Sequence, residues 1–127
     1  MRERISSGSP LEDIAAYSRA IVDDDWLFMS GTMGIDPATG KIADSFPDQA
    51  FHAFRIIDET LAKAGFSYAD VVHVRLFVAD RIHLREIVLK LQEKFSDVKP
   101  AQTMIIAQMP AEEALLEVEI TAKRRTE

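Results

Sequence analysis

The sequence predicts an α+β domain in which two helices cover one face of a single mixed β-sheet. Two stretches place apolar residues at the helical spacing of three and four, and five others are rich in β-formers. Because each helix follows strands and there are only two of them, a two-layer arrangement is favoured. With 127 residues, 47% of them hydrophobic, the chain suits one domain, residues 1–127, with its own core.

The first predicted unit is a β-hairpin. Its strands are residues 17–22 and 26–30, and the intervening Asp23-Asp24-Asp25 favours a turn because short acidic side chains hydrogen-bond to nearby backbone. Three carboxylates in a row also lack the spaced ligands of a calcium loop. Glycines and Asp36-Pro37 then interrupt residues 31–41, which predicts a surface loop.

A helix is expected from Pro47 to Ala64, with Gly65 as its left-handed cap. The run 71–79 predicts a strand, and a second helix over 84–95 has an apolar stripe that includes Val88. In the strand, alternation places one set of residues on the core face and another on a mixed face: Val72, Val74, Leu76 and Val78 against His73, Arg75 and Phe77.

Residues 103–109 and 115–122 predict the last two strands, so the expected order is β-β-α-β-α-β-β. Both helices lie on one sheet face in this arrangement, and nothing in the chain covers the other. Phe28, Phe77 and Met104 are expected on that second face. Burial against further copies of the chain would remove these side chains from water, which predicts a homo-oligomer.

Composition excludes several classes of function. Fifteen Lys and Arg against 21 Asp and Glu give a net charge of −6, the reverse of what phosphate binding needs, so we expect no nucleic-acid partner. The absence of cysteine excludes disulfides, thiolate metal ligands and a cysteine nucleophile. No apolar run approaches the length of a membrane helix, so we expect no membrane association and a soluble, cytoplasmic protein.

The titratable side chains offer few patterns with a chemical meaning. His52, His73 and His83 form no metal-ligand spacing, so we expect no metal site. His73 shares a strand face with Arg75, which suits either an anion site or an ordinary surface ion pair. Two carboxylates, Glu117 and Glu119, share a strand face; they are either exposed on an edge strand or, in a cleft, suited to proton transfer.

Six short runs spread along the chain carry a family resemblance. They are Ala16-Tyr17-Ser18-Arg19-Ala20, Phe28-Met29-Ser30-Gly31-Thr32, Asp36-Pro37-Ala38-Thr39-Gly40, Ala62-Lys63-Ala64-Gly65, Lys99-Pro100-Ala101 and Leu116-Glu117-Val118-Glu119-Ile120. In this order and spacing they resemble the Rid family, the reactive intermediate deaminases also called YjgF-like proteins. The resemblance implies a chorismate-mutase-like fold and a homotrimer with small-molecule clefts between its subunits.

The resemblance also implies a reaction, the cofactor-free hydrolysis of 2-imino or enamine acids to 2-keto acids and ammonia. Carried over by position, Glu119 is the candidate acid/base, Tyr17 a second catalytic candidate, and Ser30 and Gly31 the candidates for holding the substrate. Imine hydrolysis needs a placed water and a proton donor for the leaving nitrogen, and these residue types supply both.

Two positions depart from the family pattern. The arginine that grips the substrate carboxylate follows Pro-Ala in the family, whereas Gln102 follows Pro100-Ala101 here, and Val88 stands where an asparagine is expected. A neutral amide binds a carboxylate less strongly than a guanidinium does, so we expect weak activity on classical 2-imino acids unless Arg19 or Arg75 compensates. The alternative function is a non-catalytic homotrimer that binds a metabolite or docks on another protein. Ribonuclease activity fits the negative charge least.

Overall fold

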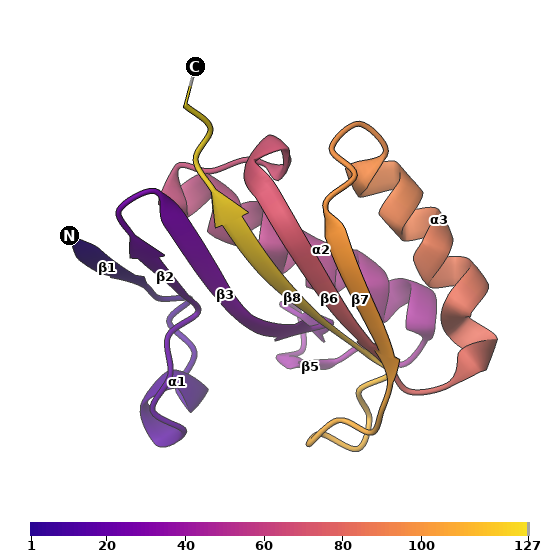
Figure 1. Cartoon of the computed structure of the whole chain (residues 1–127). Coiled ribbons are helices and arrows are strands. Elements are labelled where there is room, and N and C mark those ends of the chain that lie inside the picture. The colour runs from indigo at the N-terminus through magenta and orange to yellow at the C-terminus, as the bar shows by residue number, and fades with distance from the viewer. Residues whose placement is uncertain (127) are drawn as a thin grey trace.

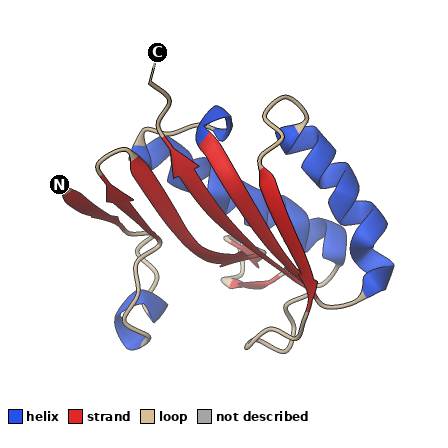
Figure 2. Ribbon diagram, in the orientation of Figure 1, coloured by secondary structure: helices blue, strands red, loops and turns tan. Residues whose placement is uncertain are grey.

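The computed structural model describes residues 1–126 and confirms the predicted two-layer α+β architecture. Figure 1 shows one twisted sheet with both long helices behind it, and Figure 2 shows the same layers by type of element. The strand order is β1-β2-β3-β8-β6-β7, antiparallel throughout except for the parallel pair β6 and β7. Within these residues, no helix has the length and apolar character needed to cross a membrane.

The sequence pattern does not predict the first two elements, β1 and the one-turn helix α1. Both are short and largely polar. The bounds are β1 Arg2–Ile5, α1 Leu11–Ile14, β2 Ala20–Asp23, β3 Trp26–Met33, β4 Ile35–Asp36, β5 Lys41–Ile42, α2 Phe46–Ala64, β6 Val71–Val78, α3 Leu84–Phe95, β7 Ala101–Ile106 and β8 Leu116–Lys123. Short 3-10 turns, Tyr68–Asp70 and Arg81–His83, precede β6 and α3.

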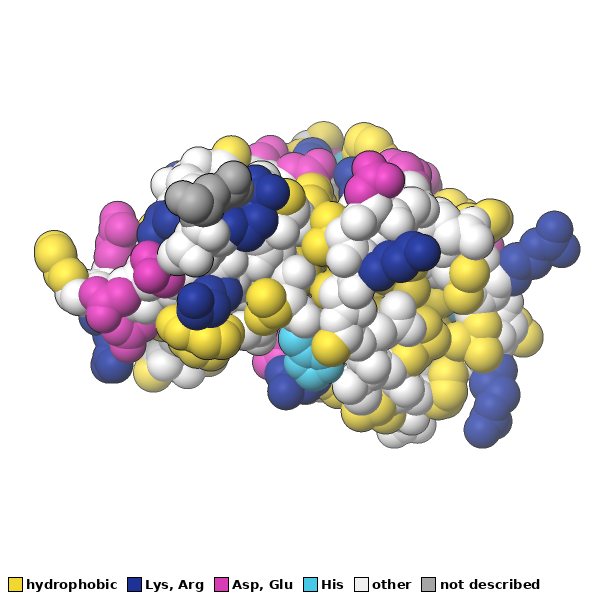
Figure 3. Space-filling model, turned by 45° about the horizontal axis from the view of Figure 1, so that its top comes forward, with side chains coloured by type: hydrophobic (Ala, Val, Ile, Leu, Met, Phe, Trp, Pro, Cys, Tyr) yellow, Lys and Arg dark blue, Asp and Glu magenta, His cyan; other side chains and the backbone are white. Residues whose placement is uncertain are grey.

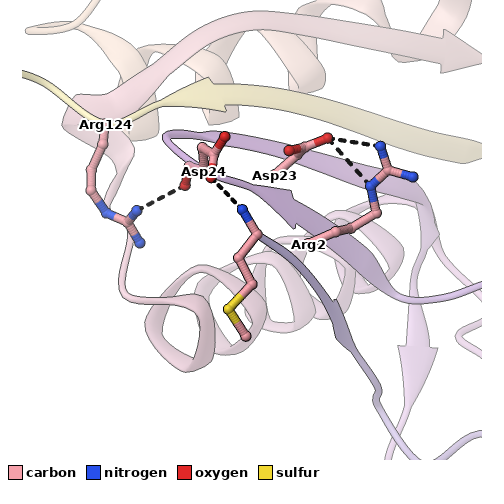
Figure 4. A network of polar contacts seen from close by, with 5 residues as sticks. Arg2, Asp23, Asp24 and Arg124 are labelled. Carbon is pink, nitrogen blue, oxygen red and sulfur yellow. Dashed lines mark hydrogen bonds and ion pairs between the residues drawn. The ribbon is translucent and has the colours of Figure 1, made fainter.

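The hairpin of β2 and β3 turns at the acidic run, as predicted. Asp24 adopts a positive φ of 55°, a conformation that aspartate tolerates better than most residues. Figure 4 shows how this turn is held: Arg2 Nη2 donates to Asp23 at 2.9 Å, and Arg124 Nη1 donates to the carbonyl of Asp24 at 3.3 Å. The polar turn therefore joins β1 and the end of β8 to the hairpin.

Helix α2 begins and ends where the sequence indicates. The Ser45 hydroxyl accepts a hydrogen bond from the Asp48 amide at 3.3 Å, and Gly65 ends the helix at φ 78°, donating to Ala62 and Leu61 carbonyls. Its buried face and that of α3 pack on the strands. The core between the layers includes Leu27, Phe54, Ile57, Leu61, Leu76, Ile87, Leu91, Val118 and Ile120.

Gln49 is a fully buried polar residue of α2 whose hydrogen bonds are satisfied. Its Nε2 donates to the carbonyls of Ala43 and Glu113, at 2.8 and 3.0 Å, and its Oε1 accepts from the Leu115 amide at 2.8 Å. Gly34 packs directly on its backbone, since a Cβ there would lie 2.2 Å from the Gln49 carbonyl oxygen. Gln49 thus fixes two loops to the helix, the one before α2 and the one between β7 and β8, and has a structural role.

A bulge in β6 alters the predicted alternation. The pairing with β8 shifts between Val71 and His73, so Val71 is buried and Val72 is 40% exposed. An extra residue in a bulge shifts the alternation by one, so the residues before the bulge lie on the sheet face opposite to the one expected. Val74, Leu76 and Val78 lie on the core face as expected, and they are fully buried.

Three further placements differ from expectation. Residues 31–41 are not all loop, because β3 extends to Met33 and β4 pairs with β5. Met104 packs against the core rather than lying on the second face, since β7 pairs in parallel with β6 and Met104 is in register with Leu76. Val88 is 44% exposed, on the side of α3 away from the sheet.

The sheet face turned toward the viewer in Figure 1 has no helix over it. Phe28 is 49% exposed on this face and stacks on Trp26, with ring centroids 6.1 Å apart. Figure 3 shows hydrophobic side chains on the surface in patches between acidic and basic ones. The surface seen in that view is therefore neither uniformly apolar nor uniformly charged.

Candidate functional site

The site begins at a bulge in the centre of β3. The pairing with β8 runs from Met29 opposite Ile120 to Thr32 opposite Val118, so Ser30 and Gly31 together oppose Glu119. Two residues against one make a β-bulge, a distortion that is common beside active sites. The bulge brings both predicted binding residues, Ser30 and Gly31, next to the two predicted carboxylates.

Arg19 holds the bulge in place. Its Nη2 donates to the carbonyls of Ser30 and Gly31, the latter at 2.9 Å, and to the Thr32 hydroxyl at 2.8 Å. Burial lowers the pKa of the Arg19 guanidinium, although arginine remains charged in proteins. Arg19 lies just before β2 rather than in a strand.

The Ser30 hydroxyl is oriented by a hydrogen bond. It donates to the carbonyl of Ser18 at 2.7 Å, and the Ser30 amide donates to the Arg19 carbonyl at 3.0 Å. With its proton engaged in this way, the hydroxyl presents lone pairs to its surroundings, so it is suited to accept a hydrogen bond from a ligand N–H.

Glu117 lies against Gly31. A Cβ placed on Gly31 would come within 2.7 Å of Glu117 Cδ and Oε2, so the absence of a side chain at Gly31 makes room for the carboxylate. Glu117 is half-buried, and burial raises the pKa of its carboxyl above the usual value; the nearby Arg19 opposes this rise and Glu119 adds to it. A carboxylate with a raised pKa is a stronger base than an ordinary one, which suits it to proton transfer.

Glu119, the carboxylate favoured from the sequence, makes a different contact. Its Oε1 accepts from Arg75 Nη1 at 3.1 Å, across the paired strands β6 and β8. Both side chains of this ion pair are partly exposed on the helix-free face. Arg75 is thus directed at Glu119.

A cleft of about 750 Å³ opens beside the bulge. Tyr17, Arg19 and Gly31 line it, so the structure brings together three of the residues that the sequence analysis considered. The other candidates are not among the lining residues: Ser30, Gln102, Glu117 and Glu119. Tyr17 is 39% exposed and precedes β2, which starts only at Ala20. The volume lies within the range usual for small-molecule sites.

Gln102 lies elsewhere in the chain. It is exposed on β7, the edge strand, and β8 and β6 separate that strand from β3. At the usual strand spacing this amounts to about 14 Å. Gln102 of one chain therefore does not meet Ser30 and Gly31 of the same chain.

The three histidines have local partners. His73 Nε2 lies 3.2 Å from the Thr103 hydroxyl, and the His83 ring stacks on Phe46 at 4.4 Å between centroids. His52 Nε2 is 3.9 Å from Asp36 Oδ2. His52 and His83 are half-buried rather than solvent-facing, and none of the three lines the cleft.

Sequence reasoning missed two features of this region. The bulge has a recognisable signature, because a glycine such as Gly31 inside a strand pattern often marks one. The contribution of α2 to the cleft, through Arg55, Glu59 and Lys63, has no sequence pattern that would reveal it.

Fold and site together define a small α+β protein with a cleft beside a bulged strand and a half-buried carboxylate. Residues 8–124 match the family model described as endoribonuclease L-PSP. A RutC family protein of Aquifex aeolicus is 32% identical over 125 residues, covering 96% of this chain and 98% of the relative. A rat 2-iminobutanoate/2-iminopropanoate deaminase is 31% identical over 81 residues, covering 63% of this chain and 59% of that protein.

A similar solved structure is that of Rv2704 from Mycobacterium tuberculosis, described as a member of the YjgF/YER057c/UK114 family. It superposes with a TM-score of 0.87 at 31% identity, covering 97% of this chain and 99% of the other. The chain belongs to this family, known as Rid, YjgF-like or endoribonuclease L-PSP. The family resemblance and the fold expected from the sequence are thereby confirmed.

Proposed function

We propose that this protein is a cofactor-independent deaminase that hydrolyses a small imine or enamine metabolite. The observation that carries the proposal is the half-buried Glu117 carboxylate lying against Gly31 at the rim of the cleft. Relatives named as 2-iminobutanoate/2-iminopropanoate deaminases support the same reaction class.

The reaction consumes water and an imine and releases ammonia and a carbonyl compound. Water adds to the C=N carbon while one of its protons passes through a carboxylate to the nitrogen, which gives a carbinolamine. The hydroxyl of this intermediate then loses its proton as C=O forms, and the nitrogen gains a proton as the C–N bond breaks and ammonia leaves. Glu117 is our first candidate for this proton transfer because of its raised pKa and its contact with Gly31. Glu119 is the second candidate, and its carboxylate is engaged in the ion pair with Arg75 at 3.1 Å.

The remaining site residues position the substrate. The Ser30 hydroxyl, next to the lining residue Gly31, is oriented to accept from the imine N–H, and Tyr17 lines the cleft. We propose that the protein works as a homotrimer, in which Gln102 of a neighbouring subunit completes the cleft. The exposed Phe28 on the helix-free face supports association of this kind.

Ammonia release from freshly generated imines tests the proposal. We expect acceleration over the buffer rate by the wild type, and at least about a tenfold loss in Glu117→Gln. No acceleration with any imine or enamine, together with saturable binding of the same compounds, would instead support the non-catalytic binding function.

A further inference from the structure

Helix α2 forms one side of the cleft, and the proposed reaction uses none of its side chains. The lining residues from this helix are Arg55, Ile56, Glu59, Thr60 and Lys63. The lining of the whole cleft includes three cationic side chains, Arg19, Arg55 and Lys63, and a single carboxylate, Glu59. In a chain of net charge −6, this is a local excess of positive charge.

The guanidinium of Arg55 retains N–H groups that could donate to a ligand. Its Nη1 donates to Glu59 Oε2 at 2.8 Å and its Nη2 to the carbonyl of Ile35 at 3.3 Å. A guanidinium has five N–H groups, so these two bonds leave others free. Nε of Arg55 has no hydrogen-bond partner among the described residues.

The partner of Arg55 is easily replaced. Glu59 is one helical turn away and 64% exposed, whereas Arg55 is 26% exposed, so the carboxylate stays hydrated and its release from the pair costs little. A ligand carboxylate that entered the cleft would therefore compete with Glu59 for the Arg55 guanidinium.

Lys63 adds a second cation. Its Nζ donates to the Ser6 carbonyl at 2.9 Å, and it makes no ion pair within residues 1–126. Because a carbonyl does not neutralise an ammonium, the charge of Lys63 remains available to an anion in the cleft.

The walls of the cleft are largely apolar. Their apolar side chains include Ile5, Leu11, Met33, Ile35 and Ile56. A cleft of about 750 Å³ with apolar walls exceeds what a small imino acid needs to be enclosed.

We propose that the cleft binds a ligand with an apolar body, whose acid group pairs with Arg55, and that the charge of Lys63, about two helical turns further along α2, adds to the attraction. The claim that such a ligand is a substrate rests on the proposed deaminase function. The claim that the cleft has an anion subsite is independent of that function, because binding alone tests it.

The probes are octanoate, hexanoate and the neutral octan-1-ol, titrated calorimetrically into the full-length protein. We expect octanoate to bind more tightly than hexanoate, because it buries more apolar surface, and about tenfold more tightly than octan-1-ol. In Arg55→Gln the affinity for octanoate should fall about tenfold, while that for octan-1-ol stays unchanged.

Glu59→Gln gives the opposite result, because it removes the carboxylate that competes for Arg55. We expect tighter octanoate binding in this variant, and it is also the informative variant if Arg55→Gln does not fold, since Glu59 is exposed. Arg85→Gln is the control, because it removes an exposed arginine of α3 that does not line the cleft.

The anion subsite would be overturned if neither Arg55→Gln nor Glu59→Gln changed the affinity for octanoate. It would also be overturned if Arg55→Gln and Arg85→Gln lost the same amount of octanoate affinity. These results leave the deaminase proposal untouched, since ammonia release is measured separately. Conversely, octanoate binding that depends on Arg55 in a protein without deaminase activity would retain the subsite and reject the proposed reaction.

Discussion

The Glu117 carboxylate occupies the space that a side chain at Gly31 would fill, with its Oε2 2.7 Å from the position of a Cβ. This contact joins the bulge of β3 to the carboxylate of β8. Gly31 does not have a positive φ, so its conformation alone does not require glycine. Its lack of a side chain matters because of the neighbouring carboxylate.

Gly31→Ala should therefore displace Glu117 without unfolding the protein. The new Cβ meets the far end of a flexible side chain, so we expect a loss of stability of about 1 kcal/mol or less and a fall in deaminase rate of about tenfold. Thermal unfolding and ammonia release measure the two effects.

Gly34→Ala is the matched comparison. There the Cβ would lie 2.2 Å from the Gln49 carbonyl oxygen, so α2 itself would have to shift, and we expect a loss of about 3 kcal/mol. A Gly31→Ala variant with wild-type turnover would show that the position of Glu117 is unimportant for the reaction.

Stability should depend on pH through Glu117. Because burial raises its folded-state pKa above the usual 4.5, the folded state binds the proton more tightly than the unfolded chain does. The stability that Glu117 contributes is then fully present below pH 4.5 and lost as pH rises through the folded pKa. Glu117→Gln cannot ionise at this position, so its stability relative to wild type should increase as the pH rises through this range.

Urea unfolding at several pH values measures the difference between variant and wild type. Glu112→Gln serves as the control for removing one negative charge from an acidic protein, since Glu112 is exposed in the loop before β8. Equal pH dependence of the two variants would show that burial does not perturb Glu117.

The sequence was sufficient for the layers of this fold and insufficient for the details of the site. The spacing of Phe54, Ile57 and Leu61 and the cap at Gly65 are local features, so α2 was predictable. Which of Glu117 and Glu119 contacts Gly31 depends on two non-local features: the bulge opposite Glu119, and the position of Arg75 one strand away. Strand alternation places both carboxylates on one face and cannot separate them.

Glu117→Gln and Glu119→Gln separate the two carboxylates by experiment. If Glu117 carries the proton, its variant loses at least about tenfold in rate and Glu119→Gln loses less, because Glu119 then mainly pairs with Arg75. Ammonia release under identical conditions compares them. The reverse order would confirm the assignment made from the sequence, in which Glu119 is the acid/base.

Gln102→Arg should raise activity on 2-iminobutanoate by about tenfold, because a charged guanidinium binds a carboxylate more strongly than a neutral amide. The comparison includes Arg19→Ala and Arg75→Ala, and Gln108→Arg as a control that adds the same charge in the exposed loop after β7. If the wild type already turns over this imino acid well and only Arg19→Ala or Arg75→Ala abolishes it, that arginine has replaced the missing one.

Association through the helix-free face predicts a trimer that Phe28→Glu disrupts. Phe28 is 49% exposed and stacks on Trp26, so in a trimer a carboxylate at this position would be buried among apolar groups, where an unpaired charge is strongly unfavourable. We expect a trimer mass for the wild type by light scattering at micromolar concentration and a monomer mass for Phe28→Glu. Leu89→Glu changes a residue of similar exposure, 57%, on α3 of the other layer, and it should leave the mass unchanged. A wild-type monomer would reject the trimer, and with it the contribution of a neighbouring Gln102 to the cleft, because no single chain brings Gln102 to Gly31.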